Sequence, residues 1–329
     1  MIILGVESTA HTFGVGIVDS NGERVPQGSS KARTEGKVLA NVFERYSSKD
    51  IGMVPDEVME HHERVAEDVL VKALEEAKVS WKEVDFIAYS AGPGIDPVLW
   101  CGYHIVKKWA SEQGKRLIGV NHCAAHLSVG KMWNKLENPC YLYVSGVNTQ
   151  IIVSEGGKYR IMGETLDIGL GNMLDKLGRV LGLGFPAGPK IEELAKKGKY
   201  IELPYVVKGM DTSFSGILTK CKQLVEKGIN KEDLCFSVQE TCFAMLAEVV
   251  ERAMAHNDKQ ELLLVGGVGA NKRFCEMLEM MCQERGAKFY KVPMDLAGDQ
   301  GAMIAWEGYL RREESGDIEV NAQWRTDEV

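Results

Sequence analysis

The chain of 329 residues lacks several features that would define a class of protein at once. No apolar run approaches the roughly 18 residues that a membrane-spanning helix needs. None of the eight cysteines forms a C-x-x-C pair, and the two C-x6-C spacings match no zinc-ribbon pattern. The apolar start MIILGV ends at Glu7 and has no basic residues before it, so it does not predict a signal peptide. We therefore expect a cytoplasmic protein whose thiols are reduced and mostly buried.

Common nucleotide-binding and catalytic motifs are also missing. No G-x-G-x-x-G follows the first predicted strand, and no Walker A sequence is present, which argues against a Rossmann domain and a P-loop NTPase. The absence of H-E-x-x-H and of a G-x-S-x-G elbow argues against a zincin protease and a serine hydrolase.

An excess of positive charge is missing as well. The net charge is -8 and the isoelectric point is about 5.5. Phosphate contacts need a basic surface, so the chain alone is not expected to bind nucleic acid strongly. A local basic patch or a basic partner subunit stays compatible with this composition.

What is present is a pattern that occurs twice. The stretch MIILGVESTAHTFGVGIVDSNG reads as an apolar strand, a polar loop, a second strand and a glycine turn. PCYLYVSGVNTQIIVSEGG follows the same plan, and helices and further strands come after each copy. This predicts an α/β protein of two duplicated lobes with a ligand in the cleft between them, the plan of the actin-like superfamily (ASKHA, ribonuclease H-like). We place the lobes at residues 1–130 and 131–310, followed by a C-terminal tail at 311–329.

Two histidines in NHCAAH, His122 and His126, are four residues apart. On a helix both imidazoles would lie on one face, one turn apart, where they could hold a metal. Tyr143, at the end of a predicted strand, and Asp299, in the loop AGDQG, could add oxygen ligands for Zn or Fe. The common alternatives are two ordinary helix histidines and, for Asp299, a helix N-cap.

Glycine-rich segments offer places where backbone could approach a ligand. LLLVGGVGAN puts Asn271 after a glycine turn, where its amide could bond a ribose or a base. PAGPKIEEL places Gly188 before a helix that carries Glu192, which could accept from ribose hydroxyls. Tight strand-to-helix turns are the alternative reading, and Asp175 in GNMLDKL reads as an ordinary surface carboxylate.

Taken together, these stretches resemble the motifs of a known family. LGVESTAHTFGVGI, EHHERVA, SAGPG, GVNHCAAH, YVSGVNTQ, GETLDIGLGNMLDK, FPAGPKIEELA, SVQETCFAMLAEV, GGVGANKR and GDQGAMIAW resemble, in order, the TsaD family of tRNA threonylcarbamoyladenosine synthases, once labelled O-sialoglycoprotein endopeptidases. The resemblance covers residue 1 to about 310. NHCAAH and the ending RTDEV resemble the archaeal and eukaryotic branch, the catalytic subunit of the KEOPS complex.

The resemblance implies an actin-like fold and a metal-dependent acyltransferase. Such an enzyme would transfer the threonylcarbamoyl group from threonylcarbamoyl-AMP to N6 of the adenosine beside the tRNA anticodon. It implies one divalent ion per subunit, Fe or Zn, and KEOPS partners: a kinase-like ATPase, a dimerising subunit and a regulatory subunit. The alternatives are a divergent paralogue acting as a nucleotide-binding ATPase or scaffold, and the old metalloprotease label.

The resemblance also assigns roles to individual residues. The implied metal ligands are His122, His126, Tyr143 and Asp299. The implied substrate contacts are Tyr143, Val144, Ser145, Gly146, Val147, Asp175, Gly188, Glu192 and Asn271. His11 matches a position that faces the substrate and is our candidate for the catalytic base.

Several positions depart from the family pattern, among them Gly269 and Lys272 in GVGANKR. Val147 and Ala187 stand where the family has glycines, and Trp100 and Asp56 stand where it has basic residues. A valine adds a β-branched side chain where backbone should approach a phosphate. The departures therefore predict weaker donor binding, while all the side-chain metal ligands remain.

Overall fold

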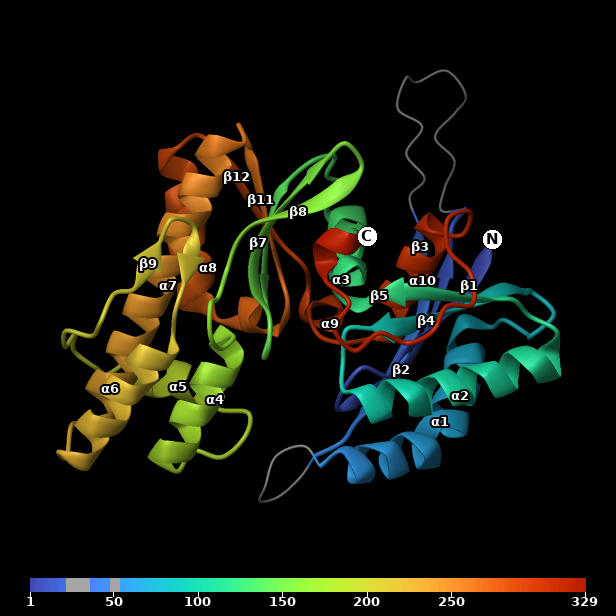
Figure 1. Ribbon diagram of the computed structural model, residues 1–329, viewed down its shortest axis with the longest axis horizontal. Helices are drawn as coiled ribbons and strands as arrows, with labels where there is room; N and C mark the ends of the chain where they lie inside the picture. The colour runs from blue at the N-terminus through green and yellow to red at the C-terminus, as the bar shows by residue number, and fades with distance from the viewer. Residues whose placement is uncertain (22–35, 48–53) are drawn as a thin grey trace. The chain divides into compact units, whose positions relative to one another are not determined.

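The computed structural model describes residues 1–21, 36–47 and 54–329 (Figure 1). The glycine turn expected at Gly22 lies outside these residues. The chain divides into two compact units, which are described separately. The first contains Met1–Lys135 together with Gly298–Val329, and the second contains Leu136–Ala297.

The first unit is built on a five-stranded mixed sheet in the order β3-β2-β1-β4-β5. Strands β1, β2 and β3 are antiparallel neighbours, whereas β4 and β5 run parallel to β1. The strands are β1 (Ile2–Glu7), β2 (Thr12–Asp19), β3 (Lys37–Arg45), β4 (Val84–Gly92) and β5 (Leu117–Asn121). The helices are α1 (Pro55–Ala77), α2 (Asp96–Gln113), α3 (His122–Asn134) and α10 (Gly301–Leu310), with a final turn η2 (Thr326–Glu328).

Helix α10 comes from the far end of the chain, yet it lies with the strands of the first unit (Figure 1, red against blue). Glycines make this contact possible, because a Cβ added to Gly5 would lie 2.2 Å from the backbone nitrogen of Ala305. A Cβ on Gly16 would lie 2.0 Å from the nitrogen of Ala302. The backbone of α10 therefore packs directly on the sheet. Helix α1 contacts β2 and β3, and α2 contacts β1, β4 and β5.

The second unit repeats the same sheet in the order β12-β11-β6-β7-β8. Strands β6, β7 and β8 are antiparallel neighbours, while β11 pairs in parallel with β6 and β12. The strands are β6 (Cys140–Val144), β7 (Thr149–Glu155), β8 (Lys158–Glu164), β11 (Glu261–Val265) and β12 (Lys288–Lys291). The other elements are α4 (Leu170–Leu181), α5 (Gly188–Ala195), the hairpin β9 (Val207–Lys208) and β10 (Asp211–Thr212), α6 (Ser215–Glu226), α7 (Lys231–His256), η1 (Gly267–Ala270), α8 (Lys272–Glu284) and α9 (Met294–Ala297).

The shared strand order confirms the predicted α/β duplication. The first expected boundary, at 130, lies close to the observed change of unit after Lys135. The second differs, since α10 and the tail belong to the first unit. The second boundary differs because α10 packs directly against glycines of β1 and β2. No local sequence pattern reveals this long-range contact.

All eight cysteines lie in the described residues as thiols, seven of them buried. Burial raises the pKa of the Cys140 thiol to about 12, so this group stays protonated at neutral pH. Across the described ranges, no helix combines the length and the apolar composition that crossing a membrane requires.

Candidate metal centre and substrate loops

Helix α3 begins where β5 ends, so its first turn lies at the carboxyl end of a parallel strand. Asn121 is the N-cap, and its Oδ1 accepts from the backbone N–H of Ala124 at 3.0 Å. The helix thus starts at His122. His122 and His126 consequently lie one turn apart on the same face, as predicted.

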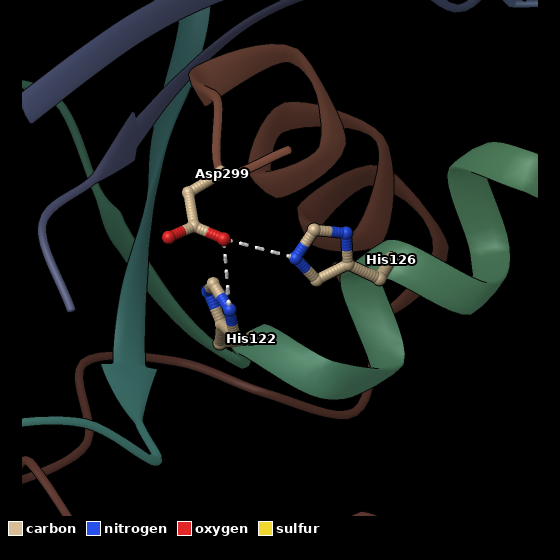
Figure 2. Close-up of side chains that lie close together, drawn as sticks. All are labelled: His122, His126 and Asp299. Atoms are coloured by element: carbon tan, nitrogen blue, oxygen red, sulfur yellow. Dashed lines mark hydrogen bonds and ion pairs between the residues drawn. The ribbon is translucent and has the colours of Figure 1, made fainter. Parts of the chain in front are cut away.

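Asp299 completes a cluster with the two histidines (Figure 2). Its Oδ1 lies 3.3 Å from Nε2 of His126 and 3.5 Å from Nε2 of His122. The ligand atoms of the three residues all lie within 4.8 Å of one another. Gln300, rather than Asp299, caps α10 through its side chain, so Asp299 does not have the N-cap role that was the alternative.

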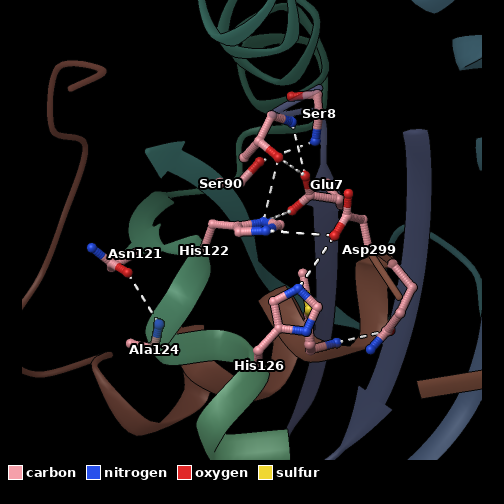
Figure 3. Close-up of polar contacts among 11 residues, drawn as sticks. Glu7, Ser8, Ser90, Asn121, His122, Ala124, His126 and Asp299 are labelled. Carbon is pink, nitrogen blue, oxygen red and sulfur yellow. Dashed lines mark hydrogen bonds and ion pairs between the residues drawn. The ribbon is translucent and has the colours of Figure 1, made fainter. Parts of the chain in front are cut away.

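A second carboxylate, Glu7, contacts the other side of the His122 ring (Figure 3). Its Oε2 lies 2.9 Å from Nδ1 of His122. Its Oε1 accepts from the backbone N–H of Thr9 at 2.8 Å and from the Thr9 hydroxyl at 2.6 Å. Because the Glu7 side chain is fully buried at the end of β1, these contacts are made away from solvent.

The electrostatics follow from this burial and pairing. Burial alone would lower the pKa of His122, but the charge and hydrogen bond of Glu7 outweigh it and raise that pKa to about 9. Burial is the main cause of the lowered pKa of His126. Burial would raise the pKa of Asp299, but the hydrogen bond with His126 and the nearby charge of His122 hold it well below its usual range.

The donor set fits a divalent transition metal. Two imidazole nitrogens and a carboxylate oxygen converge, which is a ligand combination typical of Zn and Fe sites. The carboxylate on Nδ1 of His122 is the outer contact that metal-ligating histidines usually make. Tyr143 lies in β6 of the second unit, so its ligation stays a prediction.

His11 lies just before β2 and is partly buried. Its backbone carbonyl accepts from the N–H of Tyr46 at 2.8 Å, which ties the loop to the end of β3. Burial would raise the pKa of Asp299, and the charge of His11 is the weakest of the influences that lower it, after those of His126 and His122. This places it in the neighbourhood of the cluster, and its catalytic role stays a prediction.

The predicted substrate residues all belong to the second unit. The segment Tyr143–Val147 spans the end of β6 and the following turn, and the glycine turn after β11 lies against it. A Cβ on Gly266 would come within 2.3 Å of the carbonyl oxygen of Val144. Both segments therefore meet at the carboxyl ends of two parallel strands, where α/β sheets usually bind ligands.

The turn after β6 is stabilised by the start of α4. The backbone N–H groups of Gly171 and Asn172 donate to the carbonyls of Ser145 and Gly146 at 3.1 and 2.9 Å. Val147 is 69% exposed, and its φ is outside the left-handed region. Valine is therefore accommodated without backbone strain.

Asp175 is not an ordinary surface carboxylate. Its Oδ1 accepts from the backbone N–H of Ala187 at 2.8 Å, and burial raises its pKa. Ala187, which replaces a family glycine, packs its methyl over Gly178, where an added Cβ would lie 2.0 Å away. Gly188 follows with open space around it, so its backbone stays accessible.

Asn271 and Glu192 are already engaged within the protein. Asn271 caps α8 by accepting from the N–H of Phe274 at 3.0 Å and donates to Gln239 at 2.6 Å. Glu192 accepts from the N–H of Lys272 at 2.9 Å, which joins α5 to α8. A ribose contact by either residue would share or replace these bonds.

Two further departures, Asp56 and Trp100, lie on helices of the first unit. Asp56 is in the first turn of α1, where a carboxylate interacts favourably with the helix dipole. Trp100 lies edge-on to Tyr103, with ring centroids 5.7 Å apart. Both residues therefore have local roles.

Sequence reasoning overlooked Glu7 and Thr9. The available signal was a carboxylate that ends an otherwise apolar buried strand, since an unpaired carboxylate is costly to bury. Its partner could not be inferred, because His122 lies 115 residues further along the chain.

Solved structures define the class of fold. The chain is similar to HypF of Thermococcus kodakarensis, with a TM-score of 0.61 and 14% identity over 95% of this chain and 48% of that one. It is also similar to component A of the (R)-2-hydroxyglutaryl-CoA dehydratase of Acidaminococcus fermentans, with a TM-score of 0.55 and 13% identity over 94% and 98% of the two chains. The fold is therefore the duplicated, actin-like α/β fold, as predicted.

Sequence comparison then gives the family. A family model for TsaD, tRNA N6-adenosine threonylcarbamoyltransferase, matches residues 37–306. The protein of that name from Thermococcus sibiricus is 51% identical over 100% of this chain and 99% of its own length. A Methanobrevibacter smithii protein, named as a probable bifunctional tRNA threonylcarbamoyladenosine biosynthesis protein, is 47% identical over 100% of this chain and 60% of its own length. The chain belongs to the TsaD family.

Proposed function

We propose that this chain transfers the threonylcarbamoyl group from threonylcarbamoyl-AMP to N6 of the adenosine beside the tRNA anticodon. The observation that carries the proposal is the His122, His126 and Asp299 cluster in a chain of the TsaD family. A nucleotide-binding ATPase or scaffold would not need this cluster.

The reaction is an acyl transfer to a weakly nucleophilic amine. The N6 nitrogen attacks the carbamoyl carbon, a C–N bond forms, and the C–O bond to the phosphate breaks. AMP leaves with the bonding electron pair, and N6 loses a proton. Because the mixed anhydride is already activated, positioning the amine supplies much of the rate.

Two groups of residues divide this work in the proposal. In the second unit, the turn at Ser145–Val147, Gly188 and the segments around Asp175 and Glu192 would hold the adenylate. Their backbone groups suit a phosphate because they carry no negative charge. In the first unit, His11 is the candidate that accepts the proton from N6.

His122, His126 and Asp299 would hold the metal, with Tyr143 as a further proposed ligand. A bound Zn²⁺ or Fe²⁺ would supply a Lewis acid and a fixed template for the oxygens of the substrate. The buried Glu7 contact and the convergence of the Nε2 atoms on Asp299 support this assignment.

We further propose that the chain works as the catalytic subunit of a KEOPS-type complex with a kinase-like ATPase, a dimerising subunit and a regulatory subunit. The net charge of -8 supports this proposal, because an acidic chain would need basic partners to bind tRNA tightly. The relatives named as bifunctional have further chain beyond the part that this protein matches.

The test is a single-turnover transfer assay with labelled threonylcarbamoyl-AMP and unmodified tRNA, with and without the partner subunits. We expect label on tRNA from the wild-type chain, and a loss of at least about a hundredfold in His122→Ala and Asp299→Ala. A His104→Ala variant is the matched control, because His104 lies on α2 and bonds only locally to the Trp100 carbonyl. Absence of label with folded, metal-loaded protein and all partners would reject the transferase and favour an ATPase or scaffold.

His11→Ala is tested in the same assay. A rate that falls and loses its dependence on pH supports a base. Unchanged turnover would remove His11 from the mechanism.

A further inference from the structure

Glu7 and Thr9 form a buried chain of contacts that ends on a metal-ligand candidate. Thr9 donates two hydrogen bonds to Oε1 of Glu7, through its backbone N–H and its hydroxyl. The other oxygen, Oε2, lies 2.9 Å from Nδ1 of His122. Figure 3 shows Glu7 and Asp299 approaching the His122 ring through its two different nitrogens.

We propose that Glu7 is a positioning residue for the metal centre, and that Thr9 orients Glu7. An ionised carboxylate can only accept, so the bond requires a hydrogen on Nδ1 of His122. With a hydrogen held on Nδ1, the proton that leaves for ligation is the one on Nε2, and this frees the lone pair on the nitrogen that faces Asp299 at 3.5 Å. Glu7 thereby selects the tautomer and the ring orientation that can ligate. The inference rests on the proposed metal site.

The geometry argues against a purely architectural role for Glu7. A fully buried carboxylate is costly unless it is paired, and His122 is its ion-pair partner among the described residues. An apolar residue at the end of β1 would be the cheaper solution for packing alone. The contacts from Thr9 through Glu7 to His122 also connect the β1–β2 loop, which carries His11, to the first turn of α3.

Two variants isolate the contacts of Glu7. Glu7→Gln keeps the shape of the side chain but removes its charge and allows its amide to face Nδ1. Thr9→Val removes the hydroxyl that orients Glu7 and that also lies 3.4 Å from Nδ1 of His122, and Thr9→Ser restores it. Thr12→Val is the matched control, because Thr12 is buried at the start of β2 and its hydroxyl has no hydrogen-bond partner among the described residues.

The experiment measures Zn²⁺ affinity of metal-stripped protein by competition with a chelator. Two-bond ¹H–¹⁵N NMR on the Zn²⁺-loaded protein then shows which nitrogen of His122 keeps its hydrogen, that is, its tautomer. We expect Glu7→Gln to lose about 10- to 100-fold in affinity, the range typical of outer-shell substitutions. Thr9→Val should lose affinity in the same direction but less, and it should shift the tautomer signal. Thr9→Ser and Thr12→Val should match the wild type in affinity and tautomer and in Tm without metal.

Two results would overturn the inference in distinguishable ways. Wild-type affinity and tautomer in folded Glu7→Gln would show that Glu7 does not position His122, while leaving the metal site intact. No Zn²⁺ or Fe²⁺ binding by the wild type would instead remove the metal site itself. If Glu7→Gln fails to fold, the Zn²⁺ affinities of Thr9→Val and Thr9→Ser are compared instead, because both variants keep the Glu7 carboxylate. Equal affinities would then overturn the inference.

Discussion

Val147 is the residue whose side chain most directly tests the substrate loop. It is exposed and adopts an unstrained φ, so glycine is not required there by the backbone. We expect Val147→Gly to raise the affinity for a non-hydrolysable adenylate by less than about tenfold, that is, by under about 1.4 kcal/mol. The unfolding free energy should fall by about 0.4–1 kcal/mol, because glycine gives the unfolded chain more freedom. Equilibrium binding and urea unfolding measure the two quantities, and a loss of affinity would contradict the proposed phosphate loop.

His62 carries a second prediction at this scale, about pH. Burial, followed by the charge of His61, lowers the pKa of His62 to about 3. The folded pKa is thus depressed below the unfolded value of about 6.5, so the unfolded chain binds this proton first. The stability contributed by neutral His62 is complete above about pH 6.5 and is lost as the pH falls towards 3.

We therefore expect His62→Gln to flatten the acid side of the stability profile. Between pH 6.5 and 4 the wild type should lose up to about 1.4 kcal/mol per pH unit more than the variant. Urea unfolding at several pH values measures this, with His256→Gln, at the end of α7, as the control. Parallel profiles for wild type and His62→Gln would show that His62 is not held neutral.

At the scale of elements, the first turn of α3 depends on Asn121. Besides capping the helix, its Nδ2 donates to the carbonyls of Trp324 and Arg325 at 3.2 and 3.3 Å. Asn121→Ala should cost about 2–4 kcal/mol, the sum of a lost cap and of buried carbonyls left unpaired. Asn121→Asp keeps the cap acceptor but loses the donors. If Asn121→Asp is as stable as the wild type by thermal unfolding, the contacts with the tail contribute nothing.

The close contact between α10 and the glycines of β1 and β2 predicts that a larger residue at Gly16 destabilises the protein. Gly16→Ala would force a methyl into the helix backbone and should destabilise the protein by about 3 kcal/mol or more. Gly216→Ala is the control, because this glycine lies in α6 with open space around it, and the substitution should be neutral or stabilise by up to about 1 kcal/mol. Chemical denaturation compares them, and tolerance of Gly16→Ala would mean that α10 lies further from the sheet.

Elements with a local signal were predicted from the sequence, and those without one were not. The hairpins β1–β2 and β6–β7 and the pair of histidines on α3 follow from alternation, glycine turns and a four-residue spacing. The helix α6 is an exception, because it was not predicted although the apolar residues of SGILTKCKQLVE recur at helical spacing and Ile217, Leu218 and Cys221 are buried. Glu7 and the contact of α10 with the sheet were missed because each depends on residues far apart in the chain, which a local pattern does not reveal.

At the scale of the whole molecule, the first unit is built from two separate segments of the chain and the second from one. The second unit is one continuous segment with its own core around α7, β6 and β11. We expect a fragment of residues 136–297 to fold by itself and to unfold cooperatively, as circular dichroism on heating would show. Residues 1–135 alone should not, because they lack α10, and linking 298–329 to them should restore folding. A cooperative transition in 1–135 alone would contradict this division.

The late return of the chain to the first unit sets an order of events on the ribosome. His126 leaves the ribosome 173 residues before Asp299. At about 5–20 residues per second, roughly 9–35 seconds separate them. In that interval the second unit can complete its fold, whereas the first waits with an uncovered sheet and two histidines without their carboxylate. The His122, His126 and Asp299 cluster is therefore completed among the last parts of the protein to be made. A nascent chain that has left the ribosome only as far as Ala297 would hold the whole second unit but not the third member of the cluster.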